Sequence, residues 1–422
     1  MNSIMNNEKK RTDHTYTDFK FILLGQLVSL LGSSITNFAI IWWITITTGS
    51  ALMLALASFM TLGIQSIATL FSGVIIDRYS RKLLIIVTDL LEAVFTVILI
   101  ILFIFNYENM IYILIILGFK GLFQGLHEPT VRVIVASMVP EEKLKGINSL
   151  KFLFEGLIGL LSPLLSAVLI GIFGIENIEG ILMIDGVTFI IAVVVLFFVD
   201  IPLVREKDKV KVPFMIEFKE GFSFVKTKTG LLPLLITFNL LNFIQGPLIV
   251  LYPLVVADED LFNENEMILA ITLIFFQGGI ILAAIIINTV PLFKKFTSGI
   301  GIGFIVQSIA LLLIPLSIYL LNLHIFYLAA ALFGIAVALV NVHSSLIWQS
   351  VVPLDMQGRV FAIRSTIALM SAPIAYLLTG FIVQFASILT IFTVVSICVV
   401  ILCLISWFLT SIPHIDETNV NK

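Results

Sequence analysis

Seven ionisable side chains lie within long apolar runs in the first half of the sequence: Asp89, Glu92, Lys120, Glu128, Arg132, Glu155 and Asp185. In a bilayer, such a group costs several kcal/mol, about 2.5–3.5 on insertion scales, unless it is paired or hydrated. These side chains are therefore candidates for holding a substrate or moving protons. The corresponding runs of the second half show only neutral polar groups, which predicts ion coupling in the first half and a cavity shaped by the second.

Three of these charges are interpreted as an ion-pair network. Glu128 and Arg132 are spaced i,i+4 and can pair on one helix face. Asp89 lies at a depth from which it can also reach Arg132. We expect these three residues to be connected to the loop that contains Asp77.

The other four charges are the candidates for carrying protons or substrate. Lys120 is ten residues into its run and Glu92 is nine, so both are near mid-depth at about 1.5 Å per residue. Asp185 and Glu155 each lie about two turns from an end of their runs, and Glu155 has the alternative of reaching the interface as a helix-end residue. We hypothesise that Asp185 or Glu155 takes up and releases a proton.

The composition requires a membrane environment for the elements that carry these residues. Of the 422 residues, 59% are hydrophobic and 12% charged, whereas soluble domains have about 25% charged residues. The polar start, Met1–Asp18, is followed by an apolar run too long for a signal peptide. A spanning helix needs about 20 apolar residues. Twelve runs qualify: Phe19–Thr47, Ala51–Ile76, Leu83–Asn106, Met110–Met138, Asn148–Phe173, Ile178–Val199, Gly230–Ala257, Met267–Val290, Ser298–Tyr319, Leu323–Val352, Arg364–Phe385 and Ile388–Ser411.

The distribution of basic residues sets the predicted orientation. With twelve spans, every Lys and Arg except Lys120 and Arg132 falls in segments on one side, and the opposite loops hold Asp and Glu. Basic residues are retained on the cytoplasmic side. We therefore expect a multi-pass plasma-membrane protein with both termini in the cytoplasm.

The chain is predicted to be two six-helix halves joined by a linker. Ser137–Pro140 and Ser350–Pro353 have similar sequences, and each closes the fourth run of its half, so the two segments are separated by about half the chain. We expect a tail at 1–18, a first half at 19–200, a cytoplasmic linker at 201–229, a second half at 230–411 and a tail at 412–422. Val212–Lys228 in the linker is either a short amphipathic helix at the membrane surface or a partly ordered connector.

The loop after the second run carries a recognisable motif. It reads Gly73-Val-Ile-Ile-Asp77-Arg78-Tyr-Ser-Arg81-Lys82 and resembles the loop motif of the major facilitator superfamily. Gly73 permits close helix approach, and Asp77 can face the positive end of a helix. The resemblance implies a latch between the halves, alternating access by rocking of the halves, and the fold of an all-α integral membrane protein with two pseudo-symmetric halves. The second half keeps only the positive charge of the motif, at Lys294 and Lys295.

Further segments resemble the macrolide-efflux-type group of that superfamily. They are Gly25-Gln26 with Ser29, His127-Glu128-Pro129, Val139–Asn148 and Gly358–Phe361. The resemblance implies a bacterial drug-resistance exporter of amphiphilic small molecules, working as a proton antiporter. The fifth run has Ser162-Pro163 where the antiporter motif of the family has Gly-Pro. Exporters or flippases of siderophores, peptides or lipids, and importers, remain alternatives.

Other function classes lack their motifs. The sequence has no phosphate-binding Gly-x4-Gly-Lys-Ser/Thr loop, no His-Glu-x-x-His and no Gly-x-Ser-x-Gly, so we expect neither an ATP-driven pump nor an enzyme. Cys398 and Cys403 have neither metal-ligand nor disulfide spacing. The net charge of −3 gives no indication of nucleic-acid binding. We expect a monomer without a cofactor or metal.

Overall fold

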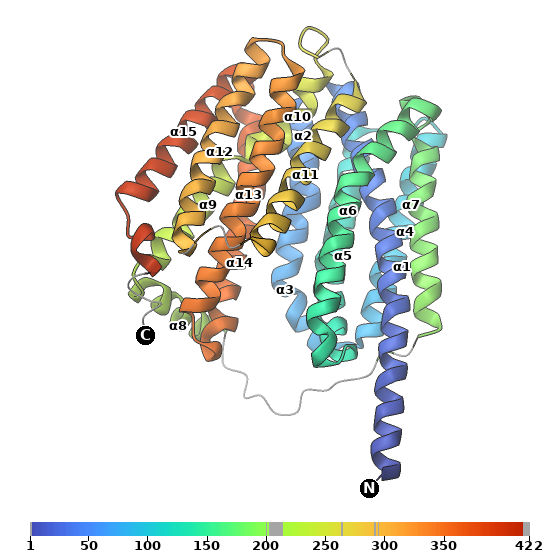
Figure 1. Cartoon of the computed structure of the whole chain (residues 1–422). Helices are drawn as coiled ribbons and strands as arrows, with labels where there is room; N and C mark the ends of the chain where they lie inside the picture. The colour runs from blue at the N-terminus through green and yellow to red at the C-terminus, as the bar shows by residue number, and fades with distance from the viewer. Residues whose placement is uncertain are drawn as a thin grey trace. The chain divides into compact units, whose positions relative to one another are not determined.

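The computed structural model describes residues 2–199, 201, 214–262, 265–290, 293 and 295–416. All regular elements within these ranges are helical, and none is a strand (Figure 1). Twelve helical segments of this part of the chain are long and apolar enough to cross a membrane. The predicted all-α membrane fold with twelve spans is therefore confirmed.

The chain divides into two compact units. The first contains α1 up to Thr47 and the elements from Leu56 to α7, and the second contains Thr48–Ala55 and α8 onwards. The helical elements up to α7 are α1 (Asn2–Thr48), α2 (Ala51–Ser58), the π-helical turn η1 (Phe59–Gly63), α3 (Ile64–Arg78), α4 (Arg81–Ile104), α5 (Met110–Met138), α6 (Glu141–Phe173), the 3-10 turn η2 (Ile175–Asn177) and α7 (Ile178–Phe197).

The second unit contains the remaining helices. They are α8 (Phe214–Thr227), α9 (Leu231–Ile244), α10 (Gly246–Ala257), α11 (Glu266–Thr289), α12 (Phe296–Tyr319), α13 (Leu323–Val351), α14 (Leu354–Ile382), α15 (Ile388–Phe408) and the 3-10 turn η3 (Ile412–His414). The seventh span consists of α9 and α10, which meet at Gln245. Pro247 has no N–H to give to the preceding turn, which favours a break there.

Three helices start earlier than the sequence predicts. Helix α1 begins at Asn2 within the expected tail, α6 at Glu141 and α14 at Leu354. The first turns of these helices are polar, and polar residues are also typical of loops, so the sequence predicts later starts. A helix end nevertheless tolerates polar and charged side chains. As a consequence Arg364, expected at a span boundary, lies inside α14, so the prediction of only neutral polar groups in the second-half spans is wrong.

The predicted repeat is present in the helix boundaries. The sequence offset between the starts of α5 and α13 equals the offset between their ends, and it also equals the offset between the starts of α6 and α14. Pro140 and Pro353 precede α6 and α14 with nearly equal dihedral angles, φ −56° and ψ 142° against φ −58° and ψ 148°. Proline is compatible with a helix start because its missing N–H has no partner there. The same local sequence thus makes the same turn in both units.

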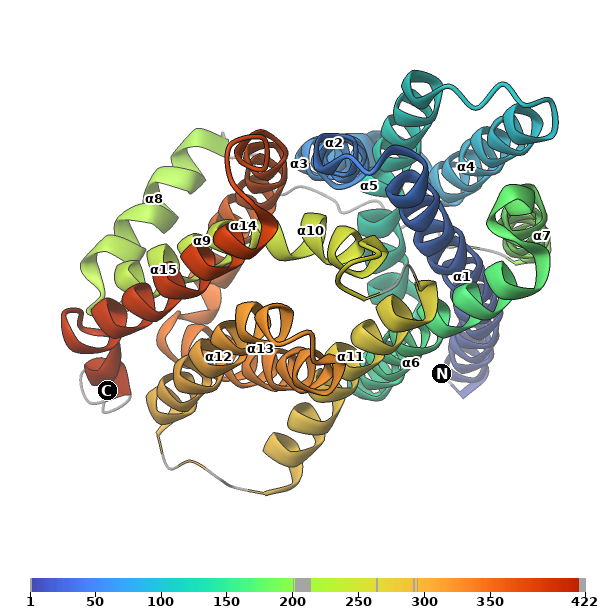
Figure 2. The same cartoon turned by 90° about the horizontal axis from the view of Figure 1, so that it is seen from above.

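The two units also share neighbour relations. Helix α5 packs on α3 and α4, and α13 packs on α11 and α12. Helix α4 contacts α7, and α12 contacts α15; Figure 2 shows α12 and α13 side by side. Gly121 and Gly334 are related by the same offset. Because they have no side chain, they let the neighbouring backbones approach closely. A Cβ at Gly121 would meet the carbonyl oxygen of Thr61, and one at Gly334 would meet that of Phe276.

The linker contains a helix in its described part. Helix α8 packs against α14 and α9 (Figure 1), and Arg359 Nη1 donates to Glu220 Oε2 at 2.6 Å. Of the predicted amphipathic segment, Val212 and Pro213 lie outside the described residues. The helical alternative therefore holds for Phe214–Thr227, and its position at a membrane surface stays a prediction.

The described residues after α15, 409–416, pack against the helices of the second unit. Ile412 and Ile415 are fully buried. Asp416 Oδ2 accepts from the backbone N of Thr297 at 2.9 Å and from its Oγ1 at 2.7 Å. The start of the expected C-terminal tail thus caps the first turn of α12.

Substituting Gly334 by alanine should destabilise the protein, because its Cβ would collide with the Phe276 carbonyl. Overpacking of this kind costs about 1–3 kcal/mol. We expect a lower thermal unfolding temperature for Gly334→Ala and for Gly121→Ala in detergent-purified protein. Gly171→Ala in α6 is the control, because a Cβ there meets nothing within 4 Å. Equal unfolding temperatures for Gly334→Ala and the control would contradict the packing role.

Candidate functional site

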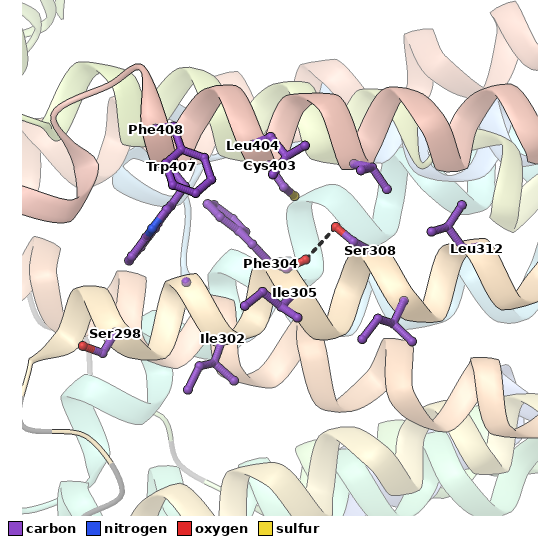
Figure 3. A pocket seen from close by; sticks show the side chains of 13 residues that line it. Ser298, Ile302, Phe304, Ile305, Ser308, Leu312, Cys403, Leu404, Trp407 and Phe408 are labelled. Carbon is purple, nitrogen blue, oxygen red and sulfur yellow. Dashed lines mark hydrogen bonds between the residues drawn. The ribbon is translucent and has the colours of Figure 1, made fainter.

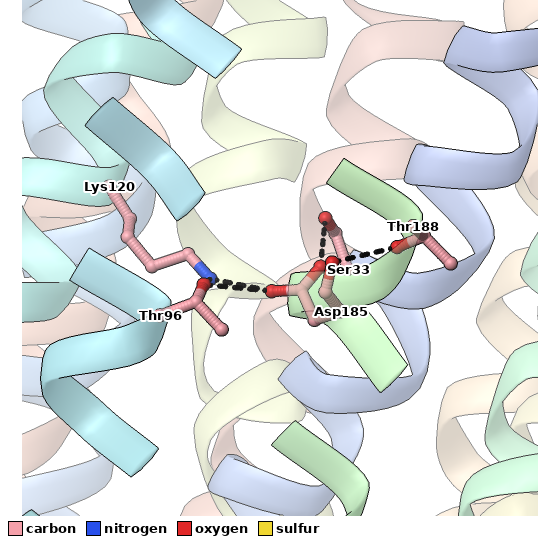
Figure 4. Close-up of polar contacts among 5 residues, drawn as sticks. All are labelled: Ser33, Thr96, Lys120, Asp185 and Thr188. Atoms are coloured by element: carbon pink, nitrogen blue, oxygen red, sulfur yellow. Dashed lines mark hydrogen bonds and ion pairs between the residues drawn. The ribbon is translucent and has the colours of Figure 1, made fainter. Parts of the chain in front are cut away.

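A fully buried carboxylate joins four helices of the first unit. Asp185 on α7 is 0% exposed. Its Oδ2 lies 2.9 Å from Lys120 Nζ on α5 and 3.1 Å from Thr96 Oγ1 on α4. Its Oδ1 accepts from Ser33 Oγ on α1 at 2.8 Å. Figure 4 shows these side chains converging on the carboxylate.

The partners of Asp185 also contact one another. Lys120 Nζ donates to Thr96 Oγ1 at 2.8 Å and lies 5.7 Å from the centre of the Phe189 ring. A buried ion pair is tolerated when further hydrogen bonds satisfy its remaining polar groups. Lys120 and Asp185, predicted as separate candidates, therefore form one largely buried ion pair. Hydrogen bonds from the hydroxyl groups of Thr96 and Ser33 support it.

A second buried carboxylate, that of Asp89, lies on α4 two helical turns before Thr96. Asp89 Oδ2 accepts from Gln26 Nε2 on α1 at 3.0 Å, and its Oδ1 lies 3.0 Å from His127 Nε2 on α5. The predicted contact of Asp89 with Arg132 is replaced by these two. The network prediction is thus wrong for Asp89, because Gln26 and His127 are nearer.

Glu92 stands between the two carboxylate clusters. Asp89, Glu92 and Thr96 are spaced i, i+3 and i+7 on the buried face of α4, and Glu92 is 6% exposed. The two clusters are about 10 Å apart along the helix at 1.5 Å per residue. Residues with this spacing present their side chains on the same face of a helix. The result is a polar stripe through an otherwise apolar helix.

Next to this stripe lies an amphipathic cavity of about 420 Å³. Its apolar wall comes from α1, α5 and α6: Phe19, Ile22, Leu23, Leu27, Leu30, Val131, Ile134, Val135, Ile158 and Gly159. Its polar and charged lining is Gln26, Ser34, Gln124, His127, Glu128, Lys151 and Glu155. Known ligand sites are mostly apolar with a few placed polar groups, and this cavity has that character.

The two carboxylates of the cavity each have a basic neighbour on their own helix. Arg132 Nη2 lies 2.5 Å from Glu128 Oε1, as predicted, and Lys151 Nζ lies 3.4 Å from Glu155 Oε1. The side chains of Glu128 and Glu155 are 48% and 43% exposed. Because α6 starts at Glu141, Glu155 lies about 20 Å from the helix start. Because α6 has 33 residues and is longer than the roughly 30 Å core of a bilayer, the alternative that Glu155 reaches the interface stays a prediction.

The motif loop makes its described contacts within the first unit. Lys82 Nζ donates to the Val199 carbonyl at 2.6 Å, which connects the start of α4 to the end of α7. Gly73 and Arg78 are exposed, and no atom would meet a Cβ at Gly73 within 4 Å, so Gly73 makes no close helix contact here. Arg81 has a partner, and the side chain of Asp77 lies outside the described residues. The latch role remains a prediction.

Two cavities in the described part of the second unit differ in character. One of about 540 Å³ lies between α12 and α15 and is apolar except for Ser298, Ser308 and Cys403 (Figure 3). The other, of about 90 Å³, is lined by three asparagines and Arg364. In the described part of the chain, no group of three His, Cys, Asp or Glu residues is placed to hold a metal.

Sequence reasoning missed the hydroxyl and amide partners of the buried charges. Ser33, Thr96 and Gln26 complete the two clusters. A signal for Gln26 and Ser33 existed, because together with Ser29 they are spaced i, i+3 and i+7 on α1. Neutral polar residues on the same face as a buried charge are useful indicators of its partners.

Curated relatives are bacterial efflux proteins. "Macrolide efflux protein A" of Streptococcus pyogenes is 26% identical over 363 residues, which cover 86% of this chain and 88% of that protein. "Macrolide efflux protein A" of Enterococcus faecalis is 25% identical over 303 residues, covering 72% of this chain and 92% of that protein.

Solved transporter structures share the fold. The nucleoside transporter NupG matches with a TM-score of 0.68 at 11% identity, covering 92% of this chain and 98% of that one. A POT family transporter in complex with 5-aminolevulinic acid matches with a TM-score of 0.69 at 13% identity, covering 94% and 96%. These likenesses show the fold alone.

Residues 22–368 match the Major Facilitator Superfamily. This match covers most of the chain, including both buried carboxylate clusters and the lining of the amphipathic cavity except Phe19. It confirms the expectation that the protein is a transporter and not an enzyme. The chain belongs to the major facilitator superfamily of membrane transporters.

Proposed function

We propose that the protein is a secondary exporter of amphiphilic small molecules that carry a basic group, driven by proton antiport. The observation that carries this proposal is the cavity between α1, α5 and α6, which combines an apolar wall with Glu128 and Glu155. The names of the bacterial relatives support efflux. A macrolide-like drug or natural product with an amine has this chemistry.

Substrate binding follows from the division of the cavity lining. The leucine, isoleucine and phenylalanine side chains of α1 take the apolar body of the substrate, at about 25 cal/mol per Å² buried. The carboxylates of Glu128 and Glu155 take its basic group, and Gln26 and Gln124 offer amides for its hydroxyl or carbonyl groups. Lys151 and Arg132 hold the carboxylates when the cavity contains no cation.

Proton coupling is assigned to the buried clusters beside the cavity. Asp185 holds Lys120 by charge, so a proton on Asp185 removes that attraction and frees the lysine side chain. Glu92 and Asp89 extend the ionisable groups along α4 to His127 and Gln26, which line the cavity. Substrate and proton thereby act on one connected set of side chains, which antiport requires.

The proposal also includes the orientation of the chain in the membrane and its transport cycle. Basic residues gather on the segments expected inside, which favours a plasma-membrane protein with both termini in the cytoplasm. Export proceeds by alternating access, with the Asp77-Arg78 loop as the latch and a monomer as the working unit. Transporters with two repeated halves work in this manner.

Replacing the cavity carboxylates should weaken transport of a basic substrate selectively. In reconstituted liposomes we expect Glu128→Gln/Glu155→Gln to raise the KM of a basic macrolide about 3- to 10-fold, because exposed charge pairs contribute about 1 kcal/mol. The KM for its uncharged N-acyl derivative should not change. Glu108→Gln, at an exposed position before α5, is the control. An equal rise for both macrolides would contradict recognition of the basic group.

Removing the charge of Asp185 should uncouple export from the pH gradient. For Asp185→Asn in inverted vesicles we expect loss of the acceleration that an imposed pH gradient gives, with substrate binding retained. Glu179→Gln in the first turn of the same helix is the matched control and should keep the acceleration.

Full gradient-driven export by both Asp185→Asn and Glu155→Gln would contradict the assignment of proton coupling to these residues. Absence of gradient-dependent movement of any amphiphile by the unaltered protein would sink the exporter proposal as a whole.

A further inference from the structure

The small cavity of the second unit contains a cation that has no counter-ion among the described residues. It measures about 90 Å³ and lies between α9, α13 and α14. Its lining residues include Asn239, Asn242, Asn341, Trp348, Arg364 and Ala368. The cavity is thus polar, although its walls are three membrane-spanning helices.

Arg364 is the charge of this cavity. It lies ten residues after the start of α14, about 15 Å along the helix. Its guanidinium stacks over Trp348, with Cζ 5.8 Å from the ring centre. In the described part of the chain no carboxylate pairs with it. A cation within a membrane span needs pairing or hydration.

The cavity also has unsatisfied hydrogen-bonding capacity. Asn239 Nδ2 donates to the Leu235 carbonyl, whereas its buried Oδ1 has no partner within the described residues. Buried polar atoms are nearly always bonded to protein, water or a ligand. Asn242 and Asn341 add amide N–H groups, which donate to anions. Asn239 Oδ1 is an acceptor and suits a bridging water rather than an anion, whereas the N–H donors of the lining suit an anion.

The repeat shows which charge is absent. At the offset that relates α5 to α13, Arg364 corresponds to Lys151 and Ala368 corresponds to Glu155. In the first unit Lys151 pairs with Glu155 at 3.4 Å. In the second unit the cation is kept while an alanine, which has no charge, stands where the carboxylate would be.

A second carboxylate of the first unit is also replaced in the second. Asn341 corresponds to Glu128, and Trp348 corresponds to Val135, which lines the first cavity. The two cavities are thus equivalent places in the two units. The first has two carboxylates and a lysine, and the second has an arginine with neutral amides.

We propose that the cavity at Arg364 binds one small monovalent anion, either a halide or a carboxylate, which takes the place that Glu155 has beside Lys151. A cavity of about 90 Å³ has room for a small anion such as chloride or formate. The guanidinium fork suits a carboxylate and also attracts a halide. This site does not depend on the proposed export of basic amphiphiles.

The test is anion-dependent stability of the full-length protein in detergent. Sodium gluconate, whose anion is bulkier than either test anion, is replaced stepwise by sodium chloride or sodium formate at constant ionic strength. Binding to the folded state stabilises it, so we expect the unfolding temperature to rise by about 2–4 °C. Arg364→Gln should abolish the rise.

A gain-of-charge variant keeps the test valid if Arg364→Gln does not fold. Ala368→Glu restores the i,i+4 pair of the first unit, so the protein should fold and show no response to either anion. Arg359→Gln is the matched control on the same helix, because Arg359 pairs with Glu220 outside the cavity, and it should keep the full response.

The outcomes separate the possible sources of the anion. A response to chloride and formate supports an inorganic anion, and a response to formate alone supports a carboxylate-bearing solute. No response of the unaltered protein overturns the proposal. An unchanged response in Ala368→Glu or Arg364→Gln overturns it as well, because the anion would then act elsewhere.

Discussion

The requirement that a charge inside a membrane be paired governs the first unit of this protein. Asp185 reaches zero exposure because Lys120, Thr96 and Ser33 supply three donors from three other helices. These contacts connect α1, α4, α5 and α7 through one polar cluster in an otherwise apolar interior. The pair depends on the charge of Asp185, and the proposed proton coupling rests on this dependence.

The same requirement distinguishes the two repeated units. Both use a proline turn at equivalent positions, a glycine contact at Gly121 or Gly334, and a basic residue ten positions into the following helix. In the first unit Lys151 has Glu155 as its partner, whereas Arg364 faces neutral amides and Ala368. The helix boundaries of the two units correspond, whereas their charges differ. This difference is the basis for the proposed basic substrate in the first cavity and the proposed anion in the second.

The sequence predicted the number of spans and the repeat, because apolar length and the Ser-x-Val-Pro segments are local signals. It also identified Lys120 and Asp185 as buried charges. Their contact could not be predicted, because they lie on helices far apart in the sequence and single-sequence reasoning gives no helix neighbours. The starts of α14 and α6 differ from the prediction for another reason: their first turns are polar, and polar residues are also typical of loops.

The central claim is that substrate binding in the cavity of Glu128 and Glu155 is coupled to protonation of the buried Asp185. Its most direct measurement is the pH of a weakly buffered solution of the purified protein while a basic substrate is added. The account predicts proton release upon binding, and a smaller release in the Asp185→Asn variant. Binding of the substrate without proton release in the unaltered protein, or equal release in the variant, would contradict the claim.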